Sequence, residues 1–391
     1  MPTGTGHITV GVMKNEVITM AHGSGGASSA ELMRRVFSKH FKSEILGRLE
    51  DSAVVGEAEG RIAVSTDSFV VTPLVFPGGD IGKLAVCGTV NDVLMSGAAP
   101  RWLTCGFIIE TGLSIETLDA ICASLAKAAE QAGVTVVAGD TKVIEGREEG
   151  GGLMINTTGI GVFEKSRDGP ERISSEQSED GPERISSERS GAIQRSYPAP
   201  SGVRPGDAVI VSGNLGDHHA AILSARMGIR NTIQSDCAIL TPIVMALREE
   251  DVGIHSMRDV TRGGLATVLN ELAEASGVSI ELLEERIPVS PEVKAFCGIM
   301  GLDPLYMGNE GKVALAVAQE DAERALTAIR ATEIGKDAAV VGAAVKLRDR
   351  DTQSAGVKKE TTITPYVTMR TRIGGTVRLD VLYGEGLPRI C

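Results

Sequence analysis

A polar tandem duplication near the middle of the chain most constrains how it can fold. The nine residues Asp168–Glu176 recur unchanged as Asp180–Glu188. Such a Gly-, Pro-, Ser- and Glu-rich stretch cannot bury enough apolar surface to form a core, so we expect a disordered loop. Two copies are too few for a solenoid. The 391-residue chain is therefore predicted to fold as two units, one on each side of an insert at residues 166–199.

Both halves alternate apolar runs with segments of helical periodicity, which predicts two α+β domains, at residues 1–165 and 200–375. In the first half we expect helices at about 28–46, 80–97 and 114–131, and strands at 61–71, 103–110, 134–138 and 153–162. In the second half we expect helices at about 219–227, 240–248, 265–275, 291–300 and 321–331, and strands at 208–212, 278–283, 312–318 and 338–345. Residues 348–372 are polar and cannot be assigned.

Composition excludes several classes of function. The formal net charge of −12 argues against a nucleic-acid surface, which needs clustered Lys and Arg. No stretch approaches the roughly 18 apolar residues of a membrane-spanning helix. Residues 1–20 lack the basic and apolar segments of a signal peptide, and the six cysteines are scattered without a C-x-x-C pair. We therefore expect a cytoplasmic protein that binds neither nucleic acid nor membrane.

The chain closes on a thiol, Cys391. Gly384, Gly386 and Pro388 precede it and favour an extended, mobile tail, which we place at residues 376–391. A thiol on such a tail can travel and act as a carrier, provided that a partner site exists for it to visit. The alternative is an inert terminal thiol, which composition alone does not exclude.

Acidic residues follow or end several apolar runs of the first half. Asp51, Asp67, Asp92 and Asp140 come from separate segments, and four such carboxylates could form a Mg²⁺–phosphate site. Taken singly, each is more often a turn residue or a helix N-cap. Asp140-Thr141-Lys142 is the stronger signal, because a cation beside a metal-binding carboxylate can face a phosphoryl group.

Glycine-rich turns offer candidate phosphate sites. Gly23-Ser24-Gly25-Gly26 precedes a helix, where backbone N–H groups favour phosphate, although a flexible loop is an equal alternative. Residues 258–264, which include Asp259 and Thr261, open another helix and form a second candidate. Glu310 lies between Asn309 and Gly311 before a strand, in a sequence that also suits a simple turn.

Two adjacent histidines, His218 and His219, suggest a metal site. Neighbouring side chains point to different faces of a helix or strand, so they rarely bind one ion together. We expect at most one functional histidine, with a polar role at a helix N-terminus favoured over zinc binding.

Together these segments resemble the HypE family of hydrogenase maturation proteins over nearly the whole chain. The resemblance rests on the following segments: 22–26 (HGSGG), 90–93 (VNDV), 138–142 (AGDTK), 215–218 (LGDH), 258–264 (RDVTRGG), 309–312 (NEGK) and the terminal 388–391 (PRIC). It implies a two-domain PurM-like fold. The N-terminal sheets would pair into a dimer barrel with ATP near that interface, and an α/β sandwich would form the C-terminal domain.

The resemblance also implies a reaction. A HypF-type carbamoyltransferase would carbamoylate Cys391, ATP would drive dehydration of this thiocarbamate to a thiocyanate, and cyanide would pass to iron on a HypC–HypD scaffold. The implied catalytic residues are Cys391, Glu310 as the base, Lys142 at the transferred phosphoryl group or the carbamoyl oxygen, and His218 in reserve. The residues implied for Mg²⁺ are Asp51, Asp67, Asp92 and Asp140, and those for ATP are Gly23, Ser24, Gly25, Gly26, Asn91, Asp92, Thr141, Asp259 and Thr261.

Two other functions remain open at this point. Another ATP-dependent enzyme of the same superfamily is one, but a selenophosphate synthetase would want a reactive Cys near residues 22–26, and a small-molecule kinase would not use a terminal thiol. The other is a non-catalytic nucleotide-binding scaffold, which would show no ATP-dependent change in mass. His219 stands where glycine is expected for the family, so backbone approach there could differ.

Overall fold

The structure, a computed structural model, describes residues 16–23, 26–47, 53, 55, 60–146, 151–163, 198–347 and 364–381. The duplicated insert, Ser24, Gly25, Asp51 and Cys391 lie outside these ranges. Among the described residues, no helix is both long and apolar enough to cross a bilayer.

The N-terminal half is built on a four-stranded sheet with strand order β1-β6-β4-β5. Its strands are β1 (Ile62–Phe69), β4 (Ala99–Glu110), β5 (Thr135–Ile144) and β6 (Leu153–Val162). β4 and β5 run parallel, and the other neighbours are antiparallel. Two further strands, β2 (Val75–Phe76) and β3 (Gly79–Asp80), form a small hairpin.

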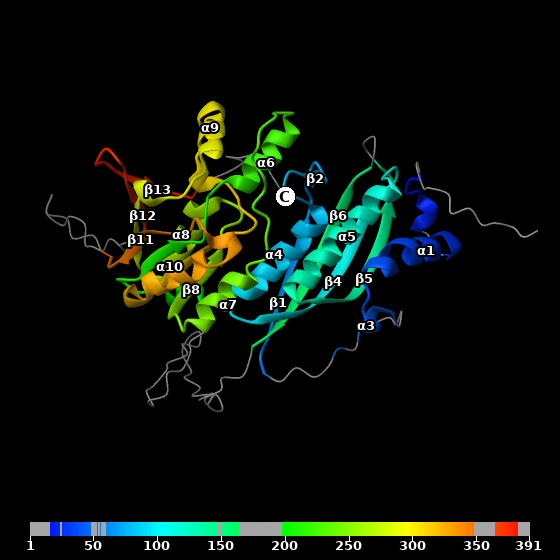
Figure 1. Ribbon diagram of the computed structural model, residues 1–391, viewed down its shortest axis with the longest axis horizontal. Helices are drawn as coiled ribbons and strands as arrows, with labels where there is room; N and C mark the ends of the chain where they lie inside the picture. Colours follow the sequence, from blue (N-terminus) through cyan, green and yellow to red (C-terminus); the bar gives the residue numbers. More distant parts are fainter. Residues whose placement is uncertain are drawn as a thin grey trace, which may run out of the picture.

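Two helices cover one face of this sheet, α4 (Ile81–Met95) and α5 (Ile115–Ala132), as Figure 1 shows. Asp80 caps α4, since its Oδ1 accepts hydrogen bonds from the backbone N–H groups of Gly82 and Lys83. Ser114 caps α5 in the same way, and Gly133 ends it with a positive φ of 68°. The chain before β1 adds short helical turns: η1 (Met20–His22), α1 (Gly26–Leu32), η2 (Met33–Phe37), α2 (Ser38–His40) and α3 (Glu44–Gly47).

The other face of the N-terminal sheet exposes apolar side chains. Alternate residues of β1 and β4 point away from α4 and α5. Among them, Ile62, Val64 and Ile108 are 52%, 65% and 40% exposed. Water-facing positions on a sheet are normally polar, so this face has the composition of an interface.

The C-terminal half contains a seven-stranded sheet with strand order β13-β12-β9-β11-β7-β10-β8. Its strands are β7 (Ala208–Val211), β8 (Ile254–Asp259), β9 (Ser279–Leu283), β10 (Val313–Val317), β11 (Ala339–Val345), β12 (Val367–Arg370) and β13 (Thr376–Leu379). Its helices are α6 (Asp217–Arg226), α7 (Thr241–Glu249), α8 (Gly264–Ser276), α9 (Pro291–Met300) and α10 (Ala322–Arg330), with short turns η3 (Pro200–Gly202), η4 (Glu284–Arg286), η5 (Pro304–Tyr306), η6 (Gln319–Asp321) and η7 (Glu333–Gly335).

One expected boundary is wrong. The tail was predicted to begin at residue 376, but residues 376–379 form β13, which pairs with β12 at the edge of the sheet. The Gly-rich turn at Gly374 and Gly375 reverses the chain, so Val377 and Leu379 lie opposite Met369 and Val367. Burial of Leu379 supplies the apolar contact that orders this segment.

Helix α4 lies between its own sheet and the C-terminal half (Figure 1), where it contacts β8 and α7. One continuous cluster of buried side chains includes Leu84 and Val90 of α4, Ile210 of β7 and Ile243 of α7. Polar contacts add to it, since Arg226 donates to the Thr72 carbonyl at 2.6 Å. The two halves are therefore packed against each other along α4.

Candidate active site between the two halves

Three carboxylates meet where β1, α4 and β8 come together. Asp67 lies on β1 on the same face as Ser65, whose hydroxyl donates to Asp92 Oδ2 of α4 at 2.8 Å. Burial, helped by Asp259 and Asp67, raises the pKa of Asp92 to about 7. Burial also raises the pKa of Asp259 to about 6, with Asp67 again contributing. These mutual effects place Asp67, Asp92 and Asp259 in one electrostatic group.

Glu310 joins this group from the turn before β10. Burial raises the pKa of Glu310 well above its usual range, and Asp236, Asp259, Cys87 and Asp92 raise it further. A Cβ at Gly88 of α4 would lie 4.0 Å from Glu310 Oε2, so the carboxyl faces that helix. The pKa of Glu310 is therefore raised first by burial and then by the neighbouring acids.

Asn309 fixes the turn that carries Glu310. Its Oδ1 accepts from Gly216 N–H at 2.8 Å, and its Nδ2 donates to the carbonyls of Val260 and Met307, both at 3.1 Å. Asn309 is fully buried. Because Val260 directly follows Asp259, these bonds hold Glu310 and Asp259 in one arrangement.

The chemistry of the carboxylate group suits a divalent cation. The described residues include no group of three side chains already arranged to hold a metal ion. Mg²⁺, however, usually takes one or two carboxylates and completes its shell with water and phosphate oxygens. Asp67 and Asp92 meet that requirement, and their mutual repulsion favours a cation between them.

Asp140 and Lys142 are separated from the carboxylate group of Asp67, Asp92 and Asp259. They belong to β5, at the opposite edge of the sheet from β1. They pair with Gly106 and Ile108 on β4, so they share the open face with Ile108. Lys142 Nζ lies 3.0 Å from Asp140 Oδ2, and both side chains are about two-thirds exposed. Within one chain, the structure does not bring Asp140 to Asp67 and Asp92.

The start of the predicted glycine loop also lies at β5. A Cβ on Gly23 would come within 2.6 Å of Val143 Cβ, so only glycine allows this approach. Gly23 thus packs against Val143, whose side chain points to the opposite face of β5 from that of Lys142. Ser24 and Gly25 are outside the described part, and Gly26 begins α1. Thr141 is half-buried on β5, and Thr261 lies in the turn between β8 and α8.

Comparisons with known proteins identify the family. Models of the AIR synthase related protein match residues 49–163 with their N-terminal domain and 204–351 with their C-terminal domain. Carbamoyl dehydratase HypE of Rhodobacter capsulatus is 41% identical over 384 residues, covering 97% of this chain and 99% of the relative. The chain belongs to the HypE family.

Solved structures agree with this assignment and confirm the two-domain PurM-like α+β fold. A crystal structure of the hydrogenase maturation protein HypE in complex with ATP superposes with a TM-score of 0.80 at 41% identity, covering 95% of this chain and 99% of that one. A HypE–HypF complex matches with a TM-score of 0.66 at 38% identity, covering 90% of this chain and 99% of the HypE chain.

In this HypE-family chain, Asn91 is occupied by a protein contact. Residues 229–240, which connect α6 to α7 without helix or strand, are called the α6–α7 segment below. Asn91 Nδ2 donates to the Ala238 carbonyl at 3.0 Å, and its Oδ1 accepts from Leu240 N–H at 2.9 Å. A role for Asn91 in nucleotide binding stays a prediction.

His218 also contacts the α6–α7 segment. Its Nδ1 lies 2.7 Å from Ser235 Oγ, and burial lowers its pKa to about 4, so the imidazole is neutral at pH 7. Its Nε2 has no hydrogen-bond partner among the described residues. His219, the next residue of α6, is likewise buried with a pKa lowered to about 4.

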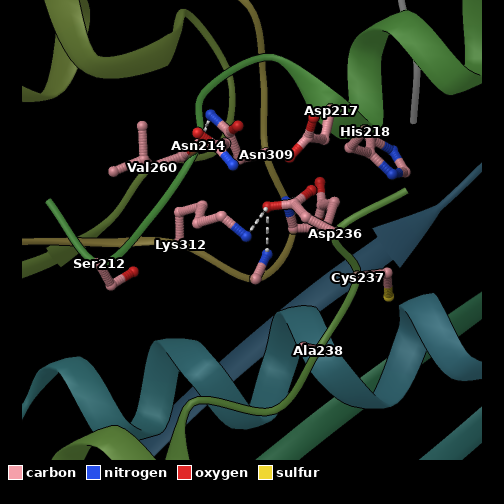
Figure 2. A network of polar contacts seen from close by, with 12 residues as sticks. Ser212, Asn214, Asp217, His218, Asp236, Cys237, Ala238, Val260, Asn309 and Lys312 are labelled. Carbon is pink, nitrogen blue, oxygen red and sulfur yellow. Dashed lines mark hydrogen bonds and ion pairs between the residues drawn. The ribbon is translucent and has the colours of Figure 1, made fainter. Parts of the chain in front are cut away.

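One buried ion pair in the HypE-type site was not predicted from the sequence. Lys312 Nζ lies 3.2 Å from Asp236 Oδ2, with both side chains less than 10% exposed (Figure 2). Asp236 stands in a segment without periodicity, and no motif singles it out. Lys312 follows Asn309-Glu310-Gly311 in the sequence, but its role as the counter-charge of Asp236 is visible only in the folded structure.

Proposed function

We propose that this chain catalyses ATP-dependent dehydration of a carbamoylated Cys391 to a thiocyanate, which donates cyanide to iron during [NiFe]-hydrogenase maturation. The likeness over nearly the full length to a protein named carbamoyl dehydratase supports this reaction. The observation that carries it is Glu310, a buried carboxyl of raised pKa that faces the acidic group between the two halves.

The chemistry requires both ATP and a base. Oxygen is a poor leaving group from a thiocarbamate, S–C(=O)–NH₂. Transfer of the γ-phosphoryl group to this oxygen converts it to phosphate, and loss of the N–H protons then gives S–C≡N, with ADP and phosphate as the other products. A carboxylate of raised pKa is a stronger base than an ordinary one, which suits Glu310 for accepting the proton.

The carboxylates beside Glu310 would bind the Mg²⁺ ion that accompanies ATP. Asp67 and Asp92 would hold Mg²⁺, with Asp259 next to them. The cation bound there would neutralise negative charge on the ATP phosphates. Because Asp92 helps to raise the pKa of Glu310, the two carboxyls are close enough that the phosphorylated oxygen and the departing proton would lie within one small site.

Asp140 and Lys142 lie on β5, at the other edge of the same sheet, and Gly23 packs against Val143 of that strand. We infer a homodimer in which the open sheet faces of two copies cover one another, because Ile62, Val64 and Ile108 would then be buried. Lys142, on that face, would act at the phosphoryl group from the interface. The loop beginning at Gly23 would contribute backbone N–H groups to the bound nucleotide.

The proposed reaction requires one partner protein that supplies the carbamoyl group and another that accepts the cyanide. A HypF-type carbamoyltransferase would load Cys391, and the solved HypE–HypF complex supports such a contact. Iron on a HypC–HypD scaffold would accept the cyanide. Asp51, Asp140 and Thr261 remain predicted ligands of Mg²⁺ or ATP.

Intact-mass measurement tests the proposal. The protein is incubated with a carbamoyltransferase, carbamoyl phosphate and ATP. We expect one carbamoyl adduct, followed by loss of one water only when ATP is present. Cys391→Ala should abolish both changes, and Cys297→Ala, which alters a buried cysteine of the C-terminal half, should retain them. An adduct that survives Cys391→Ala would show that another residue is the acceptor.

A further inference from the structure

Asp236 holds the turn that carries Glu310. Its Oδ1 accepts from Glu310 N–H at 3.1 Å and its Oδ2 from Gly311 N–H at 3.3 Å. Lys312 Nζ adds the ion pair at 3.2 Å, so three consecutive residues contact one carboxylate (Figure 2). In return, Ala238 N–H donates to the Glu310 carbonyl at 3.3 Å.

This contact leaves little freedom. The Asp236 side chain is 3% exposed, and that of Lys312 is 9% exposed. A Cβ on Gly311 would lie 2.0 Å from the Asp236 carbonyl oxygen, so the two backbones touch. The buried Asp236 carboxylate accepts from two backbone N–H groups and pairs with one ammonium group, so both of its oxygens have partners.

The other side of the α6–α7 segment is bound to the N-terminal half. Asn91 of α4 holds Ala238 and Leu240 through both atoms of its amide. Ser235 N–H donates to the Pro77 carbonyl at 2.8 Å. The Cys237 thiol points toward α4 (Figure 2), where the Cys87 thiol helps to raise the pKa of Cys237 well above its usual range. The segment therefore connects the turn of Glu310 to the helix that carries Asp92.

We propose that Asp236 is a positioning residue, which sets Glu310 against the carboxylates of α4 and β1 through the α6–α7 segment. This inference rests on the proposed dehydration. Asp236 would affect the rate of the dehydration step, and would affect neither the loading of Cys391 nor the binding of ATP. Misplacement of a reacting group by about 1 Å can cost on the order of 100-fold in rate.

Asp236→Asn is the decisive substitution. An amide keeps one acceptor for two backbone donors, turns its NH₂ toward one of them, and leaves the Lys312 ammonium without its counter-charge. We expect dehydration of the carbamoylated protein to slow on the order of 10- to 100-fold. Carbamoylation and the KM for ATP should stay within about twofold of wild type, because neither depends on Glu310. Intact mass over time measures the first two, and ATP consumption the third.

Two further variants separate positioning from stability. Asp337→Asn makes the same chemical change at an exposed carboxylate, which among the described residues accepts from Asn214 Nδ2 at 2.8 Å and does not contact the Glu310 turn, so dehydration should be unchanged. The double variant Asp236→Asn with Lys312→Met removes the unpaired buried ammonium and should recover thermal stability. Its dehydration should remain slow, because the turn still lacks its carboxylate.

Hydrogen exchange gives a readout that does not depend on the reaction. We expect the amides of Glu310 and Gly311 to lose protection in Asp236→Asn while the amides of β7 keep theirs. If the carbamoylated wild-type protein loses no water with ATP, the proposed function is wrong. Unchanged exchange of the Glu310 and Gly311 amides in Asp236→Asn would separately overturn the positioning role. Wild-type dehydration in the folded double variant would overturn it too, as would an equal fall in carbamoylation and dehydration.

Discussion

At the scale of single residues, the site concentrates negative charge in a buried place. Asp236, Asp259 and Asp92 each raise the pKa of at least one neighbouring carboxyl, and Glu310 raises that of the Cys237 thiol. Such repulsion is costly unless a bound cation or proton compensates for it. The arrangement therefore suits a site that handles protons and phosphate-bound Mg²⁺ and fits poorly with a purely structural core.

Glu310→Gln tests the base directly. The substitution preserves size but cannot accept a proton, so the carbamoyl adduct should form normally while dehydration falls on the order of 10²- to 10⁴-fold. In wild type, the rate should rise with pH until Glu310 is deprotonated, at a pH well above the ordinary range for glutamate. Single-turnover intact mass across pH measures both effects. Dehydration at the normal rate in Glu310→Gln would reject this residue as the base.

Asp217 gives a prediction about stability. Burial, together with Asp236, raises its pKa to about 6. The folded state then binds more protons than the unfolded chain, so the free energy of unfolding falls as pH rises from about 4 to about 6. Asp217→Asn should remove that decline. We expect the variant to gain on the order of 1–3 kcal/mol relative to wild type between pH 4 and pH 7.

Urea denaturation at several pH values would measure this difference. The Asn side chain keeps an acceptor for Ser290 Oγ, which contacts Asp217 Oδ1 at 3.4 Å. Curves of stability against pH that run parallel for the two proteins would contradict the prediction.

At the scale of elements, α4 links fold and site, because it carries Asp92 and Asn91 and packs against both halves. Asp80→Ala removes the cap that satisfies two N–H groups at its start. We expect a loss of about 1 kcal/mol in the free energy of unfolding, seen as a lower urea midpoint. Asp80→Ser, which keeps a capping oxygen, should lose much less. Equal losses in both variants would show that the cap contributes little.

Local patterns predicted most of these elements. Helical periodicity located α4, α5 and α9 to within two residues, and β6 matches its expected range at Leu153–Val162. The pattern missed β8, because Ile254–Asp259 alternates little and carries His and Arg. It also missed β12 and β13, whose order comes from pairing with β9 and with each other. Pairing of distant segments is not encoded in local periodicity.

At the scale of the whole molecule, part of the site could be predicted and part could not. The sequence identified Asp67, Asp92, Asp259 and Glu310 as candidates, and all four converge. It grouped Asp140 with them because all the acids follow apolar runs, but sheet order puts β5 and β1 at opposite edges. Asp236 was missed because its importance comes only from contacts made after folding.

The open sheet face predicts assembly. Val64→Asp places a charge at the centre of the proposed dimer interface, and we expect the dimer dissociation constant to rise about 100-fold or more. Sedimentation velocity at micromolar concentration should then show a monomer. Ile373→Asp, at a position that is 96% exposed in the β12–β13 turn, is the matched control and should sediment like wild type. A Val64→Asp protein that remains dimeric would place the interface elsewhere.

The buried cluster that passes through α4 has a thermodynamic consequence. Side chains of both sheets share it, so neither half can lose its packing without exposing apolar surface of the other. Heating should therefore produce a single calorimetric peak whose van't Hoff and calorimetric enthalpies agree, as in one cooperative unit, and not two peaks for two independent modules.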